Sequence, residues 1–189
     1  MKKSTKAKTL ELSGTLPVLT DFKAWGKRLR RSYRMGTAKL TKREEALPQR
    51  DRKGNAFKRA AYGYLRDLRQ AGLAAELQEY VESRDKPQWT GHEGPHALWV
   101  MRLVTKNEQT VARRQARKRF TAELSLADAN DVRRDLLLGF LYEAGPGSLI
   151  KKAAEVEKRY KWASAYRVSL PTAESGATKA KKPKPASAS

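Results

Sequence analysis

The sequence has no cysteine, and this absence excludes several classes of function. A chain without thiols forms no disulfide, has no thiolate nucleophile and offers no cysteine ligand to zinc or an iron–sulfur cluster. No apolar run approaches the roughly 18 residues of a membrane span, and the start of the chain lacks the apolar segment of a secretory signal peptide. These features predict a soluble, cytoplasmic protein stabilised by an ordinary apolar core.

Acidic residues are also scarce relative to basic ones. The chain of 189 residues has 41 Lys and Arg against 20 Asp and Glu, a formal net charge of +21. Residues 1–9 and 171–189 together carry +7, so residues 10–170 keep +14. Such a surface favours polyanions, with nucleic acid as the first candidate and an anionic membrane face or an acidic protein patch as the alternatives.

Large apolar residues are rare at both ends of the chain. We therefore expect residues 1–12 to form a basic arm and residues 171–189 a Lys/Ala/Pro tail, both disordered because neither buries enough surface to offset its ordering entropy. The remaining length suits one domain over residues 13–170.

Three stretches have the apolar periodicity of amphipathic helices, residues 57–82, 128–145 and 148–166. The first is either one long helix or a helix broken at Ala71-Gly72. The second is expected to begin at Asp128 or Asn130 as N-cap and to stop at Gly145-Pro146, and the third to begin behind Ser148.

Two further stretches are typical of strands. Residues 96–105 (HALWVMRLVT) are β-branched and aromatic, which predicts a buried strand, and residues 119–126 (RFTAELSL) alternate apolar and polar residues. The spacing of Thr105 and Glu108 is that of a capping box, which predicts a crossover helix from Glu108 to Lys118. The expected fold class is α/β or α+β, a helix-rich single domain with a small mixed sheet.

Two dense basic clusters are the candidate nucleic-acid-binding residues. If the first cluster is helical, its four side chains cover an arc of about 140°. The residues of the second cluster are interleaved with Trp25 and Tyr33, a pattern suited to phosphate contacts and base stacking. A solvated surface is the alternative interpretation. The first cluster is Arg113, Arg114, Arg117 and Lys118, and the second is Arg28, Arg30, Arg31 and Arg34.

The turn GHEGPH, residues 91–96, holds both histidines of the chain and supplies the candidate catalytic residues, Glu93 and His96. Gly94 in the same turn would let backbone N–H groups approach a phosphate. Glycine and proline prevent this turn from forming a helical metal face, so a loop histidine with a structural hydrogen bond is favoured over a zinc ligand. No carboxylate pair has a spacing diagnostic of Mg²⁺, and the metal ligands stay unknown.

Residues 46–77, from Ala46-Leu47-Pro48-Gln49-Arg50 through the helix that starts near Phe57, resemble the opening of the ParB/sulfiredoxin-like domain. In that family a strand ending in proline and arginine precedes a helix and a further apolar strand. The resemblance implies the mixed sheet, ATP and Mg²⁺ as cofactors, and Arg50 with Gly94 as nucleotide-binding residues.

In length, charge and tail composition, the whole chain is similar to the plasmid-encoded fertility inhibition factors of that fold. This similarity implies a protein that blocks conjugative or oncogenic DNA transfer through a type IV secretion system. It further implies ATPase and DNase activity towards transferred DNA bound to its relaxase, the secretion coupling protein as a further partner, and a location in the cytoplasm or at the inner membrane surface. The alternative is a non-catalytic inhibitor that binds DNA or protein by charge.

Overall fold

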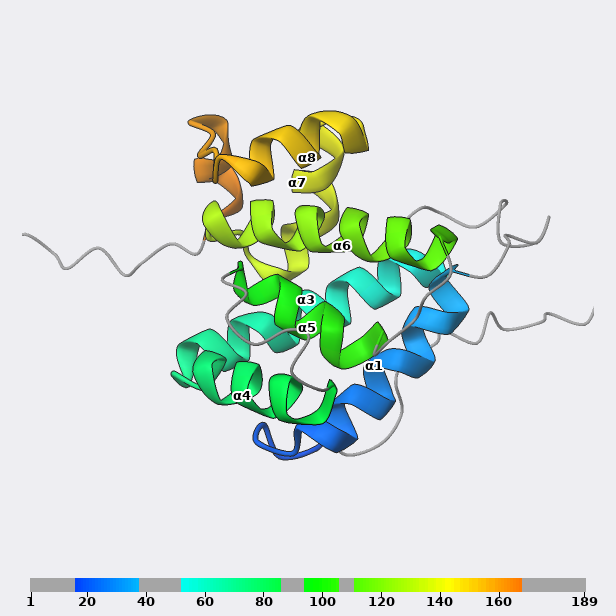
Figure 1. Ribbon diagram of the computed structural model, residues 1–189. Coiled ribbons are helices and arrows are strands. Elements are labelled where there is room, and N and C mark those ends of the chain that lie inside the picture. The colour runs from blue at the N-terminus through cyan, green and yellow to red at the C-terminus, as the bar shows by residue number, and fades with distance from the viewer. Residues whose placement is uncertain (1–15, 38–51, 86–93, 106–110, 168–189) are drawn as a thin grey trace, which may run out of the picture.

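The protein is helical throughout the part that its structure, a computed structural model, describes (Figure 1). The described residues are 16–37, 52–85, 94–105 and 111–167. In chain order the elements are α1 (Phe22–Thr37), α3 (Lys53–Gln70), α4 (Ala74–Asp85), α5 (His96–Thr105), α6 (Val111–Ala129), the 3-10 turn η3 (Arg134–Leu136), α7 (Leu137–Glu143), α8 (Gly147–Glu155) and the 3-10 turn η4 (Trp162–Tyr166).

The expected mixed sheet is wrong. Among the described residues there is no strand, and the one β-type pairing is an isolated bridge between Val132 and Arg167. Both segments predicted as strands are helices, so the described residues do not form the sheet that the ParB/sulfiredoxin-like resemblance implies.

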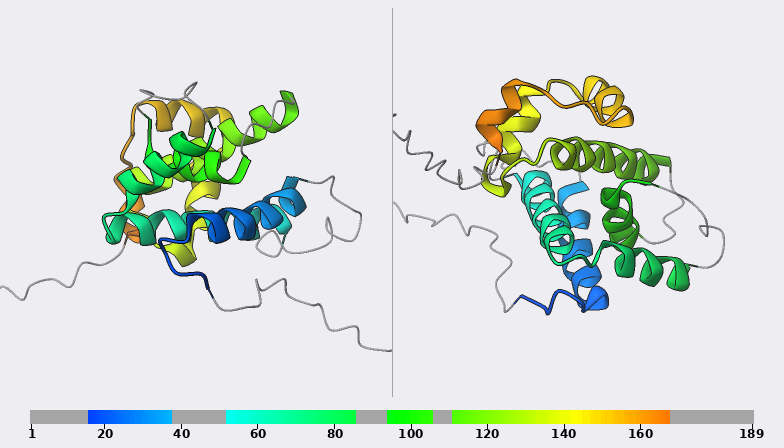
Figure 2. Two further views of the ribbon diagram at one scale, coloured as in Figure 1. Left: turned by 60° about the horizontal axis from the view of Figure 1, so that its bottom comes forward. Right: turned by 90° about the vertical axis from the view of Figure 1, so that its left-hand side faces the viewer.

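Residues 96–105 form α5, which is the central helix of the molecule. It packs against α1, α3, α4 and α6 (Figure 2), and its residues from Trp99 to Thr105 are all buried. A short helix that is covered on every side is apolar all round, so its sequence has no helical periodicity to separate it from a buried strand. The β-branched and aromatic residues of this segment then favoured a strand, and that prediction is wrong.

Residues 119–126 continue α6 without interruption. The buried positions Phe120, Leu124 and Ala127 recur at helical spacing along its inner face, and the apparent alternation of the sequence has no structural counterpart. The expected crossover helix therefore does not stop at Lys118. Thr105 is the last residue of α5, and its hydroxyl donates to the carbonyl of Met101 (2.8 Å). Glu108, its predicted capping-box partner, lies outside the described residues.

The helical prediction over residues 57–82 is confirmed, and of its two alternatives the structure has the broken helix. It is divided into α3 and α4 at Ala71-Gly72, where Gly72 has a φ of +72°, a conformation that glycine adopts at little cost. Its predicted apolar face is the one that packs into the core, with Phe57, Leu65 and Leu68 at most 1% exposed.

The other two predicted helices are shorter than expected. Asp128 lies within α6 and Asn130 follows it, so α7 begins only at Leu137, although its predicted stop at Gly145 is confirmed. Gly147, not Ser148, opens α8, which ends at Glu155.

Asn130 accounts for the interruption after α8. Its buried amide donates to the carbonyls of Leu126 and Lys158 (both 2.9 Å), and its side-chain oxygen accepts from the N–H of Tyr160 (2.8 Å). These bonds fix the chain that follows α8 against the end of α6, in place of a continuing helix.

Candidate nucleic-acid interface

Three aromatic rings from distant parts of the sequence meet at one corner of the molecule. Tyr33 of α1 lies 5.2 Å from Phe57 of α3 and 5.9 Å from Phe120 of α6, and the last two rings lie 5.1 Å apart, all between ring centroids. The edge-to-face arrangement is a favourable one for aromatic rings. This triad holds the end of α1 beside the starting halves of α3 and α6 (Figures 1 and 2).

The segments joined by the triad, residues 22–37, 52–66 and 111–122, contain sixteen Lys or Arg and no Asp or Glu. We call them the basic corner. The end of α1 and the start of α3 come together closely, since a Cβ added at Gly36 would lie 2.9 Å from the Cα of Gly54. Glycine at both positions therefore lets two basic segments meet at their backbones.

The exposed face of α1 carries a row of cations. Lys23, Lys27, Arg31 and Arg34 are exposed and lie within an arc of about 80° on a helix that turns 100° per residue. Among the described residues none of the four has an ion-pair or hydrogen-bond partner. We call these four residues the α1 row.

The opposite face of α1 holds the aromatic residues that were expected to stack on bases. Trp25 is 6% exposed and Tyr33 1% exposed, and Trp25 stacks on Tyr64 with 4.3 Å between ring centroids. Both rings belong to the core and cannot receive a base.

Arg30 has a different role from the α1 row. Its guanidinium donates to the carbonyls of Val104 (2.7 Å) and Leu103 (3.1 Å), at the end of α5. Arg84 of α4 reaches the same helix end, at the carbonyl of Arg102 (3.2 Å). Two positive groups thus satisfy the free carbonyls and the negative dipole end of a buried helix.

Arg28 is half-buried and, like Arg30, interacts within the protein. Of the four cations predicted in this cluster, Arg31 and Arg34 remain available to a ligand. The sequence could not reveal the cap that Arg30 forms, because the carbonyls it reaches lie more than 70 residues away.

The first half of α6 adds a second set of cations. Arg114 and Lys118 are exposed, Arg117 is half-buried, and none of the three forms an ion pair within the described part of the chain. The side chain of Arg113 lies outside the described residues. Glu123, the first acidic residue along α6, is buried and paired with Lys58 (2.9 Å), so it does not offset the exposed cations.

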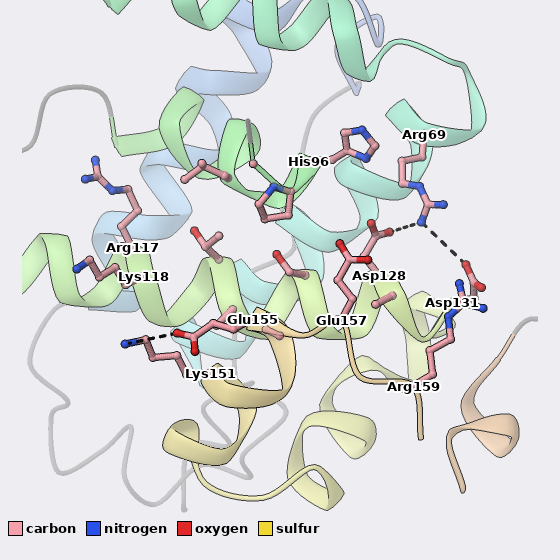
Figure 3. Close-up of a pocket in the computed structure, with 18 residues that line it drawn as sticks. Arg69, His96, Arg117, Lys118, Asp128, Asp131, Lys151, Glu155, Glu157 and Arg159 are labelled. Atoms are coloured by element: carbon pink, nitrogen blue, oxygen red, sulfur yellow. Dashed lines mark hydrogen bonds and ion pairs between the residues drawn. The ribbon is translucent and has the colours of Figure 1, made fainter. Parts of the chain in front are cut away.

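A groove of about 760 Å³ runs over α6 between the start of α5 and α8 (Figure 3). Its basic end holds Arg117, Lys118 and Lys151. At its opposite end Arg69 pairs with Asp128 (2.6 Å), and this hydrogen bond raises the pKa of the Arg69 guanidinium.

Two of the other predicted residues also lie on this groove. Gly94 and His96 line the wall at the start of α5, and Figure 3 shows His96 beside Arg69, at the end of the groove away from Arg117 and Lys118. No local sequence pattern connects these two pairs of residues. His96 is the exposed first residue of a helix and not part of a loop. Glu93 and Arg50 lie outside the described residues.

Two hydroxyl groups of the groove carry no obvious sequence signal. Thr121 and Ser125 line it one helical turn apart, and their oxygens are buried without a hydrogen-bond partner in the described structure. Sequence reasoning placed them on the wet face of a strand and assigned them no role. The described residues contain no group of three side chains suited to a metal ion, and ATP and Mg²⁺ remain predictions.

Comparison with family models, with curated proteins and with solved structures finds no match to this chain. No described helix combines the length and the apolar character that crossing a membrane requires.

Proposed function

We propose that this protein binds nucleic acid through its phosphate backbone, at the basic corner and without reading base sequence. The observation that carries the proposal is the convergence of three segments with sixteen cations and no acids on one aromatic triad. Phosphate contacts give affinity and position, whereas sequence is read by contacts with base edges. The exposed Lys and Arg of the α1 row and of α6 are suited to the first role.

A solvated surface would explain scattered cations, but it does not explain this distribution. Ordinary solvated faces mix both signs, because like charges placed together repel each other. The remainder of the described chain follows that pattern, since residues 123–167 contain eight Lys or Arg and seven Asp or Glu. An anionic ligand would offset the repulsion within the basic corner.

The wider role, inhibition of conjugative DNA transfer, is part of the proposal in a reduced form. The mixed sheet that the family resemblance implies no longer supports this role, because the described residues form no sheet. The basic surface that such a role needs is present. Occupation of the transferred DNA in the cytoplasm, with a relaxase and a type IV coupling protein nearby, is the form of inhibition that binding alone would produce.

Nucleotide-dependent DNA cleavage is the second candidate function. The one observation in its favour is that Gly94 and His96 share a groove with Arg117 and Lys118. Incubation of the full chain with DNA, ATP and Mg²⁺ separates the candidates, because only cleavage predicts phosphate release and strand scission.

A salt titration tests the proposed binding directly. Fluorescence anisotropy with three unrelated duplexes of equal length should give equal affinities that fall steeply with salt. About six phosphate contacts would lower the affinity roughly a thousandfold between about 50 and 200 mM salt, through release of condensed counterions. Affinity that hardly changes with salt, or that differs widely among the duplexes, would contradict backbone binding.

A further inference from the structure

The groove over α6 adjoins the basic corner and differs from it in shape and chemistry. Arg117 and Lys118 belong to both, and Lys151 of α8 faces them across the groove (Figure 3). Lys151 lies 3.8 Å from Glu155 in an exposed, loose ion pair, which a stronger anion could displace at little cost. Three cations therefore lie at one end of the open groove.

Neutral donors continue the groove beyond these cations. The hydroxyls of Thr121 and Ser125 are buried without partners in the described structure, and a buried polar group without a hydrogen bond carries a free-energy penalty. The first turn of α5 lies on the adjacent wall, where the N-terminal end of a helix adds a partial positive charge. A ligand with acceptor oxygens would satisfy these groups together.

The far end of the groove sets a limit on what enters. Asp128, Asp131 and Glu157 line it together with Arg69 and Arg159, so the charges at this end nearly balance and offer a continuous polyanion no net attraction. A volume of about 760 Å³ lies within the range of small-molecule sites. The groove therefore suits one anionic group with a compact neutral body, and not a long strand.

We propose that this groove binds a terminal phosphate monoester, carried by the end of a nucleic-acid strand or by a free mononucleotide. Arg117, Lys118 and Lys151 would hold the phosphate, and Thr121 and Ser125 would donate to it or to the adjoining sugar. A terminal monoester has a charge of about −1.5 to −2 at neutral pH, more than the single charge of an internal phosphate diester. For strand ends, the inference rests on the proposed nucleic-acid binding. For free mononucleotides, it does not.

Binding of matched oligonucleotides to the full chain tests the first source. Short single strands of one sequence, with a 5′-phosphate, a 3′-phosphate or hydroxyls at both ends, are compared by anisotropy with the label at the opposite end. Charge-assisted hydrogen bonds predict a preference of roughly tenfold for one phosphorylated end. The double variant Arg117→Gln/Lys118→Gln should lose this preference.

Two controls separate the groove from general charge. Lys23→Gln/Lys27→Gln removes the same charge from α1, and it should weaken all three oligonucleotides while keeping the preference. Ser125→Leu fills the groove without changing charge, and it should remove the preference while leaving hydroxyl-ended binding intact. Circular dichroism confirms that each variant is folded, and the double Gln variant changes only side chains outside the core.

Thermal shift with AMP and with adenosine tests the second source independently of DNA binding. Stabilisation by AMP but not adenosine, lost in Arg117→Gln/Lys118→Gln, would support the groove even if the chain failed to bind DNA. Equal affinity for phosphorylated and hydroxyl ends, together with no shift from AMP, would overturn the proposal. A preference that the α1 control removes as fully as the groove variant would overturn it too.

Discussion

The basic corner and the C-terminal region, residues 123–167, use charged side chains in opposite ways. In the C-terminal region cations pair with acids: Arg133 with Asp135 (2.8 Å) and Lys151 with Glu155 (3.8 Å). In the basic corner, the four cations of the α1 row have no partner among the described residues. The exposed cations of the α1 row thus differ from Arg133 and Lys151, which have acidic partners nearby.

The two regions also differ in where they place apolar side chains. The basic corner buries its aromatic rings, with Tyr33, Phe57 and Phe120 at most 1% exposed. The C-terminal region leaves Tyr142 and Val156 more than two-thirds exposed. The binding proposed for the basic corner would therefore rest on charge, and the buried aromatic residues there would contribute only by fixing where the charges lie.

The largest expected effect comes from removing the ring that joins the three basic segments. Phe120→Ala should lower the free energy of unfolding by about 3–5 kcal/mol, because it leaves a cavity between α1, α3 and α6. DNA binding should fall with it. Urea denaturation followed by circular dichroism measures the first effect and anisotropy the second.

Trp162→Ala is the matched change in the C-terminal region. Trp162 is 37% exposed, so its loss should cost clearly less stability than that of Phe120 and leave DNA affinity unchanged. Equal losses of DNA binding in the two variants would remove the distinction between the regions.

The next effect is that of charge alone. Replacing Lys23, Lys27, Arg31 and Arg34 by Gln should reduce DNA affinity by about tenfold or more and make the logarithmic salt slope shallower by roughly 0.9 for each phosphate that is no longer neutralised. Stability should change little, since all four side chains are exposed. Replacing Arg133, Lys152, Lys158 and Lys161 by Gln removes the same charge from the C-terminal region, outside the groove over α6, and an equal change of slope there would show that only net charge matters.

A smaller effect separates two neighbours on α1. Arg30→Gln should lower the free energy of unfolding by about 1.5–3 kcal/mol, because it uncaps the carbonyls of Leu103 and Val104. Arg31→Gln should stay within about 0.5 kcal/mol, as expected for an exposed residue, and should weaken DNA binding more. Chemical denaturation and anisotropy on both variants would refute the assignment if the two effects were reversed.

The smallest effect at neutral pH concerns Tyr62, whose hydroxyl donates to the carbonyls of Val132 (2.7 Å) and Ala127 (3.1 Å). Tyr62→Phe should cost about 1 kcal/mol. Burial raises the pKa of the Tyr62 phenol above its ordinary value. Its contribution is therefore complete below about pH 10, where the unfolded chain also keeps the proton, and falls by about 1.4 kcal/mol per pH unit above that value.

Melting temperatures measured from mildly alkaline pH to about pH 11 check this dependence. Burial also raises the pKa of Tyr64. The Tyr62→Phe variant should therefore still lose part of its stability at alkaline pH, through Tyr64. An identical loss in the variant and the wild type would exclude Tyr62 as a contributor.

The helices α3 and α4 were predictable from the sequence, and the central helix α5 was not. The buried residues Phe57, Ala61, Leu65 and Leu68 recur every three or four positions along α3, which is the spacing of a helix. Almost all of α5 is buried, so its local sequence does not distinguish a helix from a strand. The wrong prediction of a sheet follows from that segment and from the chance alternation after Arg119.

The sequence identified which residues of the candidate site are basic, but it did not predict how they are arranged in space. Arg31, Arg34, Arg114 and Lys118 were identified as basic and are exposed. The capping role of Arg30 and the joining of Gly94 with Arg117 in one groove depend on contacts between distant segments. Local patterns contain no information about such contacts.

The aromatic triad ties the acquisition of binding to the completion of the fold. No contiguous stretch contains the whole basic corner, because its three segments are separated in the chain and joined only through Tyr33, Phe57 and Phe120. A nascent chain still lacking Phe120, or a chain cut between α3 and α6, would hold DNA with only part of the surface. Separation of any one of the three segments would therefore dismantle the whole proposed binding surface.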